Sequence, residues 1–281
     1  CISTGAAIKN LGIGENSIIE GGDGTGSLVG NMKGGIIENC YNEGLVTGIG
    51  GSFGTGGLIG VGEYGKITNC YNTGMVKGVS DVGGIVGYVD KNFTIDNCYN
   101  CGMINASGLF VGGLVGLMYA GIITNSYNIG MISDGPLFVN AIVGATDMDP
   151  FIIKNCYYSK ELTNIGEEIT NGISEKSVEE MKAASFITLL NGGQNPIAWT
   201  ADTRNINGGF PILVWQSSPV TGIQNASEKT NCNIYVVDKS IVVECSENVP
   251  CQMNVINLNG EIINSQTFLK NNSLNITDNG I

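Results

Sequence analysis

The sequence of 281 residues contains no histidine and only one arginine, Arg204. Without histidine the chain cannot form a Ser-His-Asp triad, an HExxH zinc site or any other site that relies on imidazole. Its 13 basic residues stand against 25 acidic ones, which gives a net charge of −12 and a pI near 4.3. This charge excludes the basic surface typical of nucleic-acid-binding proteins. No apolar run approaches the about 18–20 residues of a membrane span, so no span is expected.

Charged residues make up only 14% of the chain, whereas glycine is abundant, with 43 residues. A hydrophobic content of 42% predicts a folded chain rather than a disordered acidic one. The nine cysteines are odd in number and include a single CxxC, Cys98 and Cys101, without the second pair of a structural zinc site, so neither a metal site nor a cofactor is predicted. Residues 1–5 lack the basic start and apolar core of a secretion signal, which fits a removed leader or a segment of a longer protein.

A tetrapeptide recurs at intervals of 30, 28, 28 and 30 residues. It reads Asn-Cys-Tyr-Asn, or a close variant, and begins at Asn39, Asn69, Asn97, Asn125 and Asn155. A second signature, an aliphatic pair followed by glycine, runs in step with it at 28–30, 58–60, 85–87, 114–116 and 142–144. Short apolar runs separated by Gly and Asn predict strands and turns rather than helices. Such a unit cannot bury its own apolar side chains, so we expect the units to stack.

The repeats therefore predict an all-β fold in which residues 1–158 form a right-handed parallel β-helix of about five to six coils. Each strand would pair in parallel with the same strand one coil away, so that like residues stack on like. One inward ladder would contain Ile37, Ile67, Ile95, Ile123 and Ile153. A second would contain Leu28, Leu58, Ile85, Leu114 and Ile142.

One repeat position holds a column of small sulfur or hydroxyl side chains, Cys40, Cys70, Cys98, Ser126 and Cys156. Because a thiol and a hydroxyl fit the same small site, we interpret the column as a structural ladder of reduced, packed thiols. Disulfides between neighbouring coils, or a thiolate metal column, are the alternatives. The asparagine columns that begin at Asn39 and Asn42 predict side-chain amides that hydrogen-bond along the axis.

The repeats resemble the GLUG motif family, which occurs in bacterial surface proteins and beside some immunoglobulin-A peptidases. The resemblance rests on Gly-Gly-Leu-Ile-Gly at 56–60, on Asn-Cys-Tyr-Asn-Thr-Gly-Met-Val at 69–76 and on their counterparts in the other repeats. It covers about half of the chain, because the repeats end at Tyr158. The resemblance implies a β-helical surface or adhesion segment without catalytic residues of its own.

Residues 159–215 are predicted to form a helical and strand-containing C-terminal cap of the solenoid, in which both tryptophans cover the last coil. A capping box at Ser177 predicts a helix at 178–190. Residues 216–222 resemble a linker. Alternation in residues 223–281, with Asn-Gly at 259–260, predicts a small antiparallel β-sandwich.

That last segment resembles the C-terminal sorting domain of Bacteroidetes type IX secretion. The resemblance rests on residues 254–263 and on the terminal Asn-Gly-Ile at 279–281. It implies export to the surface of a bacterium of that group. Members of the family continue past this Gly-Ile with a further strand, whereas the sequence stops there, so a truncated sorting domain is one interpretation.

A carbohydrate-active enzyme on a β-helix would place acidic side chains on one outer face of successive coils. The expected outward column is Glu38, Thr68, Asp96, Thr124 and Lys154, which never sets two acids on adjacent coils. Asp147 and Asp149 could donate oxygens to calcium, with a solvated turn as the simpler interpretation. We therefore predict no enzyme, with a polysaccharide lyase or hydrolase as the alternative.

One column goes beyond these structural patterns: Leu45, Met75, Met103 and Met131. If alternation holds, these side chains face outward as an apolar stripe that could bind a partner. The alternative is that a loop or the C-terminal domain covers them. The sequence thus predicts a monomeric, secreted or cell-surface adhesion module whose ligand is a host or surface glycoprotein or glycan. A structural stalk is a further alternative.

Overall fold

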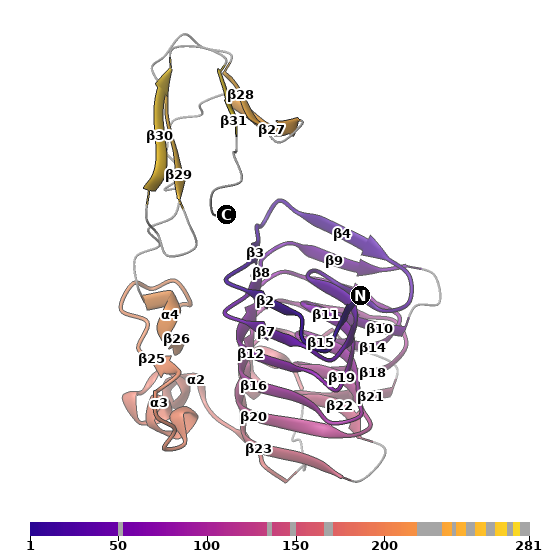
Figure 1. Cartoon of the computed structure of the whole chain (residues 1–281). Coiled ribbons are helices and arrows are strands. Elements are labelled where there is room, and N and C mark those ends of the chain that lie inside the picture. The colour runs from indigo at the N-terminus through magenta and orange to yellow at the C-terminus, as the bar shows by residue number, and fades with distance from the viewer. Residues whose placement is uncertain are drawn as a thin grey trace. The chain divides into compact units, whose positions relative to one another are not determined.

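A computed structural model describes residues 1–49, 53–133, 137–146, 150–165 and 171–217. Beyond them it describes the backbone of five strands between residues 232 and 275. The chain divides into two compact units, residues 1–217 and 218–281. The first unit is a stack of coils whose strands pair in parallel from one coil to the next (Figure 1). The predicted all-β class and the stacked parallel solenoid are confirmed.

Each complete coil visits four parallel sheets, here numbered I to IV in chain order. Sheet I contains β5 (Thr25–Gly26), β10 (Phe53–Gly56), β14 (Ser80–Gly83), β18 (Leu109–Gly112) and β21 (Leu137–Asn140). Sheet II contains β1 (Ile2–Ser3), β6 (Val29–Lys33), β11 (Ile59–Glu63), β15 (Val86–Asp90), β19 (Val115–Met118) and β22 (Val143–Thr146).

Sheet III contains β2 (Ala7–Lys9), β3 (Gly12–Ile13), β7 (Ile36–Glu38), β8 (Tyr41–Asn42), β12 (Lys66–Asn72), β16 (Phe93–Asn100), β20 (Gly121–Asn128), β23 (Phe151–Tyr158) and β24 (Ile173–Glu175). Sheet IV contains β4 (Ile18–Gly21), β9 (Leu45–Gly48), β13 (Val76–Gly78) and β17 (Ile104–Ala106). The alternation of inward and outward side chains along these strands fills the centre of the stack.

The core consists of the ladders that the repeats predict. Ile37 pairs with Ile67, and the same register continues through Ile95, Ile123 and Ile153. All five side chains are buried. The second ladder lies in the same core, where only Leu28, near the N-terminal end, is partly exposed. Each coil thus buries its apolar residues against its neighbours, which a single coil could not do.

Asparagine shapes the turns within sheet III. The first Asn of each tetrapeptide adopts the left-handed conformation, with φ between 51° and 60° at Asn39, Asn69, Asn97, Asn125 and Asn155. Asparagine tolerates this conformation better than most residues. Three residues later, the amide of Asn72 donates to Asn100 at 2.8 Å and to the carbonyl of Gly74, and its neighbours repeat the pattern. The predicted amide ladder is therefore confirmed for the column that begins at Asn42, whereas in the column that begins at Asn39 the amide of Asn97 bonds to Gln194 instead.

After Tyr158 the chain first continues the last coil. α1 (Lys160–Thr163) is followed by β24, which pairs in parallel with β23 and buries Ile173 in the core. Residues 177–217, which we call the flank strap, then run beside the stack (Figure 1). The strap contains α2 (Val178–Lys182), α3 (Ala184–Asn191), β25 (Trp199–Thr200), β26 (Ile212–Leu213) and α4 (Val214–Ser217).

The flank strap covers a ladder of tyrosines rather than the end of the solenoid. Tyr41, Tyr71, Tyr99 and Tyr127 stack with successive ring centroids 5.1 Å apart. Trp215 stacks on the first two rings, and Trp199 packs at a tilt on the other two. The expectation that the tryptophans cover the last coil is therefore wrong. Because every coil presents its tyrosine on the same side, the apolar surface to be buried runs along the axis.

The predicted helix at 178–190 is two helices. Its N-terminal capping box is present, since the Ser177 hydroxyl accepts from the Glu180 amide and the Glu180 carboxylate accepts from the Ser177 amide. Ala183 interrupts it with an extended backbone, ψ 149°, and α3 begins at the next residue. Phe186 on α3 then packs edge-on against Tyr157, at a centroid distance of 5.0 Å.

The predicted linker at 216–222 begins two residues too early. Gln216 belongs to the first unit, because it is buried and its amide donates to the Tyr99 hydroxyl at 2.8 Å.

The described strands of the second unit pair antiparallel, as predicted. They are β27 (Cys232–Val237), β28 (Ser240–Cys245), β29 (Cys251–Ile256), β30 (Ile262–Phe268) and β31 (Asn272–Asn275). The Asn-Gly at 259–260 lies outside the described residues. Within the described part of the chain, no helix has the length and hydropathy that a membrane crossing requires.

Candidate functional site

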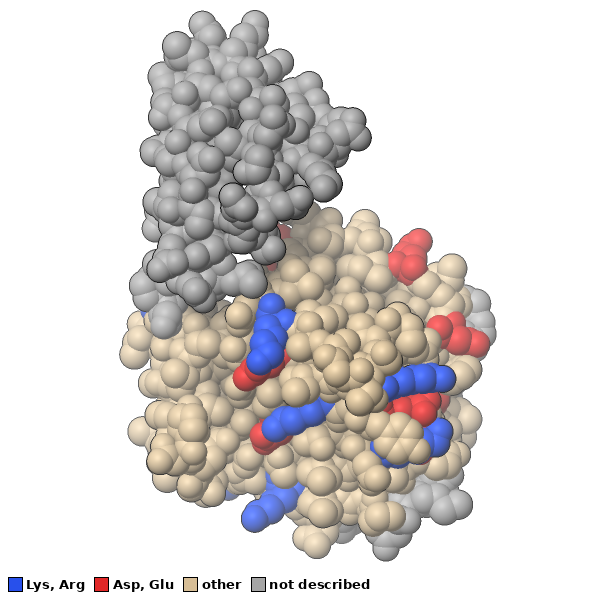
Figure 2. Space-filling view, in the orientation of Figure 1, with Lys and Arg blue, Asp and Glu red and all other residues tan. Residues whose placement is uncertain are grey.

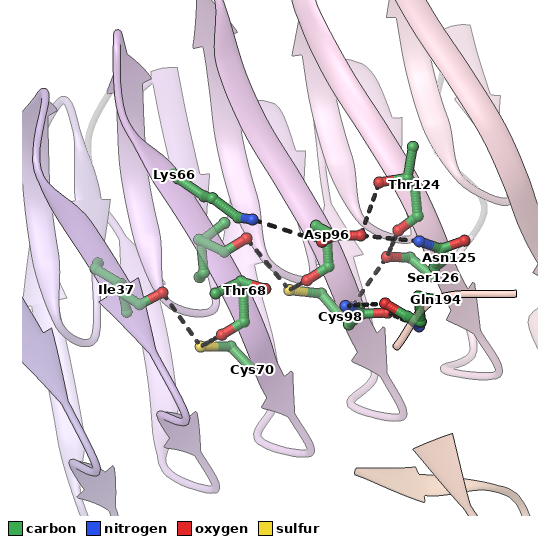
Figure 3. Close-up of polar contacts among 12 residues, drawn as sticks. Ile37, Lys66, Thr68, Cys70, Asp96, Cys98, Thr124, Asn125, Ser126 and Gln194 are labelled. Carbon is green, nitrogen blue, oxygen red and sulfur yellow. Dashed lines mark hydrogen bonds and ion pairs between the residues drawn. The ribbon is translucent and has the colours of Figure 1, made fainter. Parts of the chain in front are cut away.

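The outer face of sheet III carries a polar ladder centred on Asp96 (Figure 3). The Asp96 carboxylate accepts hydrogen bonds from Thr124 Oγ1 at 2.8 Å and Asn125 Nδ2 at 3.0 Å, and it pairs with Lys66 Nζ at 3.6 Å. Its neighbours in register are Thr68 and Thr124. A glycosidase would place a second acid within reach of the first. The Asp96 ladder instead ties adjacent coils together.

Other charges on the solenoid are also paired. Lys9 contacts Glu38 at 2.7 Å, and Lys91 contacts Glu63 at 3.0 Å. Figure 2 shows several side chains of opposite charge next to one another, and a few isolated charges, on a surface that is mostly uncharged. Such exposed pairs add little to stability. Uncharged side chains therefore form most of the surface on this side of the molecule.

The cysteine column forms a single file in the core, as predicted from the repeats (Figure 3). The Cys70 thiol donates to the Thr68 carbonyl oxygen at 3.1 Å, and the Cys40 amide donates to Cys70 Sγ at 3.3 Å. Ser126 repeats both contacts with its hydroxyl, which donates to the Thr124 carbonyl oxygen and accepts from the Cys98 amide. A hydroxyl can therefore replace a thiol here because both groups donate and accept in the same directions.

The cysteines of this column stand as free thiols. Burial raises the pKa of the Cys98 thiol to about 12 and raises that of Cys70 well above its ordinary value. A protonated, buried thiol is a poor nucleophile and a poor metal ligand. The geometry thus gives Cys70 and Cys98 a packing role, whereas at the N-terminal end of the column the hydrogen bond with Cys70 lowers the pKa of Cys40 to about 7. Among the described residues no cluster of three or more Cys, Asp or Glu could hold a metal, and Asp147 and Asp149 lie outside them.

The predicted stripe of Leu45, Met75, Met103 and Met131 is a column at the start of sheet IV. Successive coils are joined there by backbone hydrogen bonds, such as Val76 N–H to the Met103 carbonyl oxygen at 2.9 Å. The stripe alternates with buried residues such as Val76. Its first three side chains are half-buried, and Met131 is 46% exposed. Register extends the column to Ile18, which is 70% exposed.

A larger apolar surface lies on sheet I, and the sequence patterns had not singled it out. We call it the aromatic flank; it contains Phe53, Leu109, Phe110, Leu137 and Phe138. Leu137 and Phe138 are 59% and 56% exposed, and Phe53 is 46% exposed. The rings of Phe110 and Phe138 stack with centroids 5.2 Å apart. Register aligns Leu109 with Leu137, so the side chains of two coils form one contiguous patch.

A signal for the aromatic flank was present in the sequence. Leu-Phe-Val recurs at 109–111 and 137–139, in the same phase of the repeat. The other coils carry Phe-Gly-Thr at 53–55 and Ser-Asp-Val at 80–82. Attention to positions that vary between coils, and not only to those that recur, would have found it. The side chains at such positions cannot be needed by every coil, so they are free to serve a partner.

Comparison with known proteins supports the repeat assignment. Residues 51–77 match the GLUG motif. This GLUG segment spans β10, β11 and β12 and ends within β13, so it is one coil of the solenoid. It includes Phe53 of the aromatic flank, Cys70 of the thiol column and Met75 of the stripe.

No curated protein matches the chain. Among solved structures, the chain is similar to a crystal structure from Bacteroides ovatus titled as that of a "putative immunoglobulin A1 protease". The sequences are 24% identical, the TM-score is 0.54, and the match covers 74% of this chain and 69% of that one. At this identity the similarity shows the fold alone. Neither the GLUG match nor this structure addresses the sorting-domain resemblance of residues 223–281, which stays a prediction.

Proposed function

We propose that this chain is a non-catalytic binding module of a secreted or cell-surface protein, and that the aromatic flank is its contact surface. The observation that carries the proposal is the exposure of contiguous Leu and Phe side chains on two adjacent coils. Contiguous apolar patches on a soluble surface mark sites of interaction. Aromatic side chains supply much of the binding energy at protein interfaces because they bury a large area at little conformational cost.

The chemistry of the flank favours the protein part of a surface glycoprotein over its glycan. Leu109 and Leu137 extend the rings with aliphatic area, which suits the apolar centre of a protein interface. Sugar sites, in contrast, combine rings with several polar side chains that bond to hydroxyl groups. A glycan partner is therefore the alternative that the binding assay must separate.

A catalytic role has less support. The polar ladder engages the Asp96 carboxylate with Lys66 and Thr124, and both adjacent coils place threonine beside it, so it sets no pair of acids on neighbouring coils. The name of the Bacteroides ovatus structure makes immunoglobulin A1 a reasonable glycoprotein to include as a partner. We propose binding of such a protein, without its cleavage by this chain.

The test is a binding array of extracellular-matrix proteins, immunoglobulin A1 and purified glycans, probed with the 281-residue chain. The variant Leu137→Asn/Phe138→Asn removes the most exposed part of the flank. Ile152→Asn is the matched control, since Ile152 is 52% exposed on sheet III. We expect the flank variant to lose at least about tenfold in affinity for a protein partner, and the control to lose less than about twofold. Equal losses, or binding to glycans alone, would refute the proposal.

A further inference from the structure

Asp81 is the second residue of β14 and lies at the bend where the chain passes from sheet IV into sheet I. It is 7% exposed, and among the described residues no hydrogen bond or ion pair reaches its carboxylate. Burial raises the pKa of Asp81 to about 6, and no neighbouring cation opposes that rise. A buried carboxylate without a partner is costly, and native proteins rarely keep one without a reason.

The fold itself does not require a carboxylate at this corner. The equivalent positions in other coils are Gly24, Gly54, Phe110 and Phe138, and all five residues adopt the left-handed conformation with φ between 54° and 71°. Glycine adopts this conformation without strain. Asp81 thus departs from the repeat at a place where glycine would stabilise the turn equally well.

Asp81 lies at the edge of the aromatic flank. In register it is next to Phe110 in the following coil and next to Gly54, which has no side chain, in the preceding one. Tyr88 of β15, on sheet II, lies near enough for its charge state to be affected by Asp81, and its ring meets that of Tyr119 edge-on at 5.6 Å. The pKa of Tyr88 rises to about 12, through burial first and then through nearby charges that include Asp81. The carboxylate therefore has aromatic neighbours, whereas the place beside Gly54 is filled by Val61, whose Cγ2 atom lies 2.8 Å from where a Cβ on Gly54 would stand.

We propose that Asp81, together with the rings of Phe110 and Tyr88, receives a basic side chain, arginine or lysine, from the protein that binds the aromatic flank. This inference rests on the proposed function and adds the chemistry of the partner. The flank would bury apolar residues of the partner, while Asp81 would pair with a cation placed next to them.

Four considerations favour a cation at this place. An ionised carboxylate can only accept hydrogen bonds, and a guanidinium or ammonium group supplies the missing donors. Aromatic faces also attract cations, arginine above all. Among the residues that the structure describes, no ion pair reaches this carboxylate, and Lys91, beside Tyr88, pairs with Glu63 and Asp90. A net charge of −12 also favours association with a basic partner.

The test follows the Asp81 carboxyl carbon by NMR in the full chain labelled with carboxyl-¹³C aspartate, with the resonance assigned by Asp81→Asn. The probes are the peptide acetyl-Leu-Arg-Leu-amide, its lysine analogue and its citrulline analogue, which is a neutral isostere of the arginine form. We expect the arginine or lysine peptide to move the Asp81 resonance and to shift its titration midpoint to lower pH. The citrulline peptide should leave the midpoint unchanged.

Two outcomes would overturn the inference: equal effects of the arginine and citrulline peptides, or a midpoint that none of the peptides moves. A neutral oligosaccharide that moves the Asp81 resonance where the basic peptides do not would replace the cation with a sugar. The variant Asp81→Asn suits the corner because asparagine also tolerates positive φ. It should abolish the preference for arginine over citrulline while retaining any apolar contact.

The outcomes separate this inference from the proposed function. If Leu137→Asn/Phe138→Asn abolishes binding of the protein partner and Asp81→Asn does not weaken it, the flank is the contact surface and the cation site fails. If neither variant affects binding, the proposed function fails first.

Discussion

Two flanks of the same solenoid carry aromatic side chains, and the chain treats them differently. On sheet III a tyrosine recurs in every coil from Tyr41 to Tyr157, and the flank strap covers the column with Trp199, Trp215 and Phe186. On sheet I aromatic residues occur in only three coils, at Phe53, Phe110 and Phe138, and they stand partly or largely exposed. Both flanks are built from parallel strands stacked coil on coil. They differ in that the aromatic residue recurs in every coil on sheet III but not on sheet I.

The comparison separates structure from function within a repeat. A side chain that recurs in every coil satisfies a requirement that every coil has, such as packing on its neighbour. A side chain that occurs in one or two coils is not required by the coil and can be selected by a partner. Asp81 fits the second class, because the corresponding corners hold Gly or Phe. The expected effects of mutation should therefore differ in kind between the flanks.

The largest expected effect is at Trp199, which is fully buried and donates from Nε1 to Asn97 Oδ1 at 3.1 Å. Trp199→Ala should destabilise the first unit by about 3–5 kcal/mol, because it removes a large side chain and leaves a cavity over the tyrosine column. Denaturant unfolding followed by tyrosine and tryptophan fluorescence measures the loss. The matched variant on the other flank, Phe138→Ala, should cost less than about 1 kcal/mol. Similar losses at both positions would remove the distinction between the covered and the exposed flank.

The next prediction concerns Asp81, where a substitution should raise the stability of the protein instead of lowering it. Because the folded-state pKa of Asp81, about 6, lies above its ordinary value of 3.8, the folded protein gains stability when Asp81 is protonated. That contribution is complete below pH 3.8 and is lost as the pH rises through 6. At about pH 7.5, Asp81→Asn should therefore stabilise the protein by up to about 3 kcal/mol, whereas near pH 4 the variant and the parent should be nearly equal.

Thermal unfolding at the two pH values measures this difference. The strands packed against β14 carry three further titratable groups, Lys77 on β13 and Tyr88 and Asp90 on β15. Tyr88 stays neutral in this range because its pKa is about 12, and Asp90 is paired with Lys91. A variant that is less stable than the parent at pH 7.5 would show that the carboxylate has an internal partner. If Asp81→Asn gains stability and also loses the preference for the arginine peptide over the citrulline peptide, it shows the combination expected of a binding residue.

The sequence predicts the periodic part of this molecule well, for a physical reason. When Ile67 stacks on Ile37, the same side chain meets the same environment in each coil, so the spacing of the repeats determines the register. The flank strap has no repeat, and its docking depends on the shape of the tyrosine column, which exists only after the coils have stacked. The tryptophans could therefore be recognised as buried, but their position could not be predicted.

The candidate site was harder to predict for the same reason. The burial of Asp81 depends on the bend between β13 and β14, and the stack of Phe110 on Phe138 depends on coil-to-coil register. The repeat pattern instead drew attention to Met75 and Met103, which the structure shows as half-buried. The identity of any ligand lies in side chains that the repeat leaves free, and periodicity carries no information about those.

A smaller effect is expected in the methionine stripe. Met75→Asn/Met103→Asn should cost less than about 1 kcal/mol per substitution, because both side chains are half-buried and already contact water. The neighbouring inward residue provides the control: Val76→Asn should cost at least about 3 kcal/mol, since it places a polar group in the apolar core. Thermal unfolding compares the two. A loss in the stripe as large as that at Val76 would show that the column belongs to the core.

The smallest expected effect concerns the thiol column, where a reductant should change nothing. If Cys40, Cys70, Cys98 and Cys156 are packed thiols, dithiothreitol leaves the melting temperature of the first unit unchanged. Iodoacetamide in guanidinium, without reductant, should then label all four in a peptide map, whereas in the native protein burial should protect them. Cys98→Ser should be tolerated, with a loss below about 1 kcal/mol, because Ser126 makes the same hydrogen bonds one coil away. Disulfide-linked peptides from adjacent coils would instead mean that covalent links, and not stacking alone, hold the coils of the solenoid together.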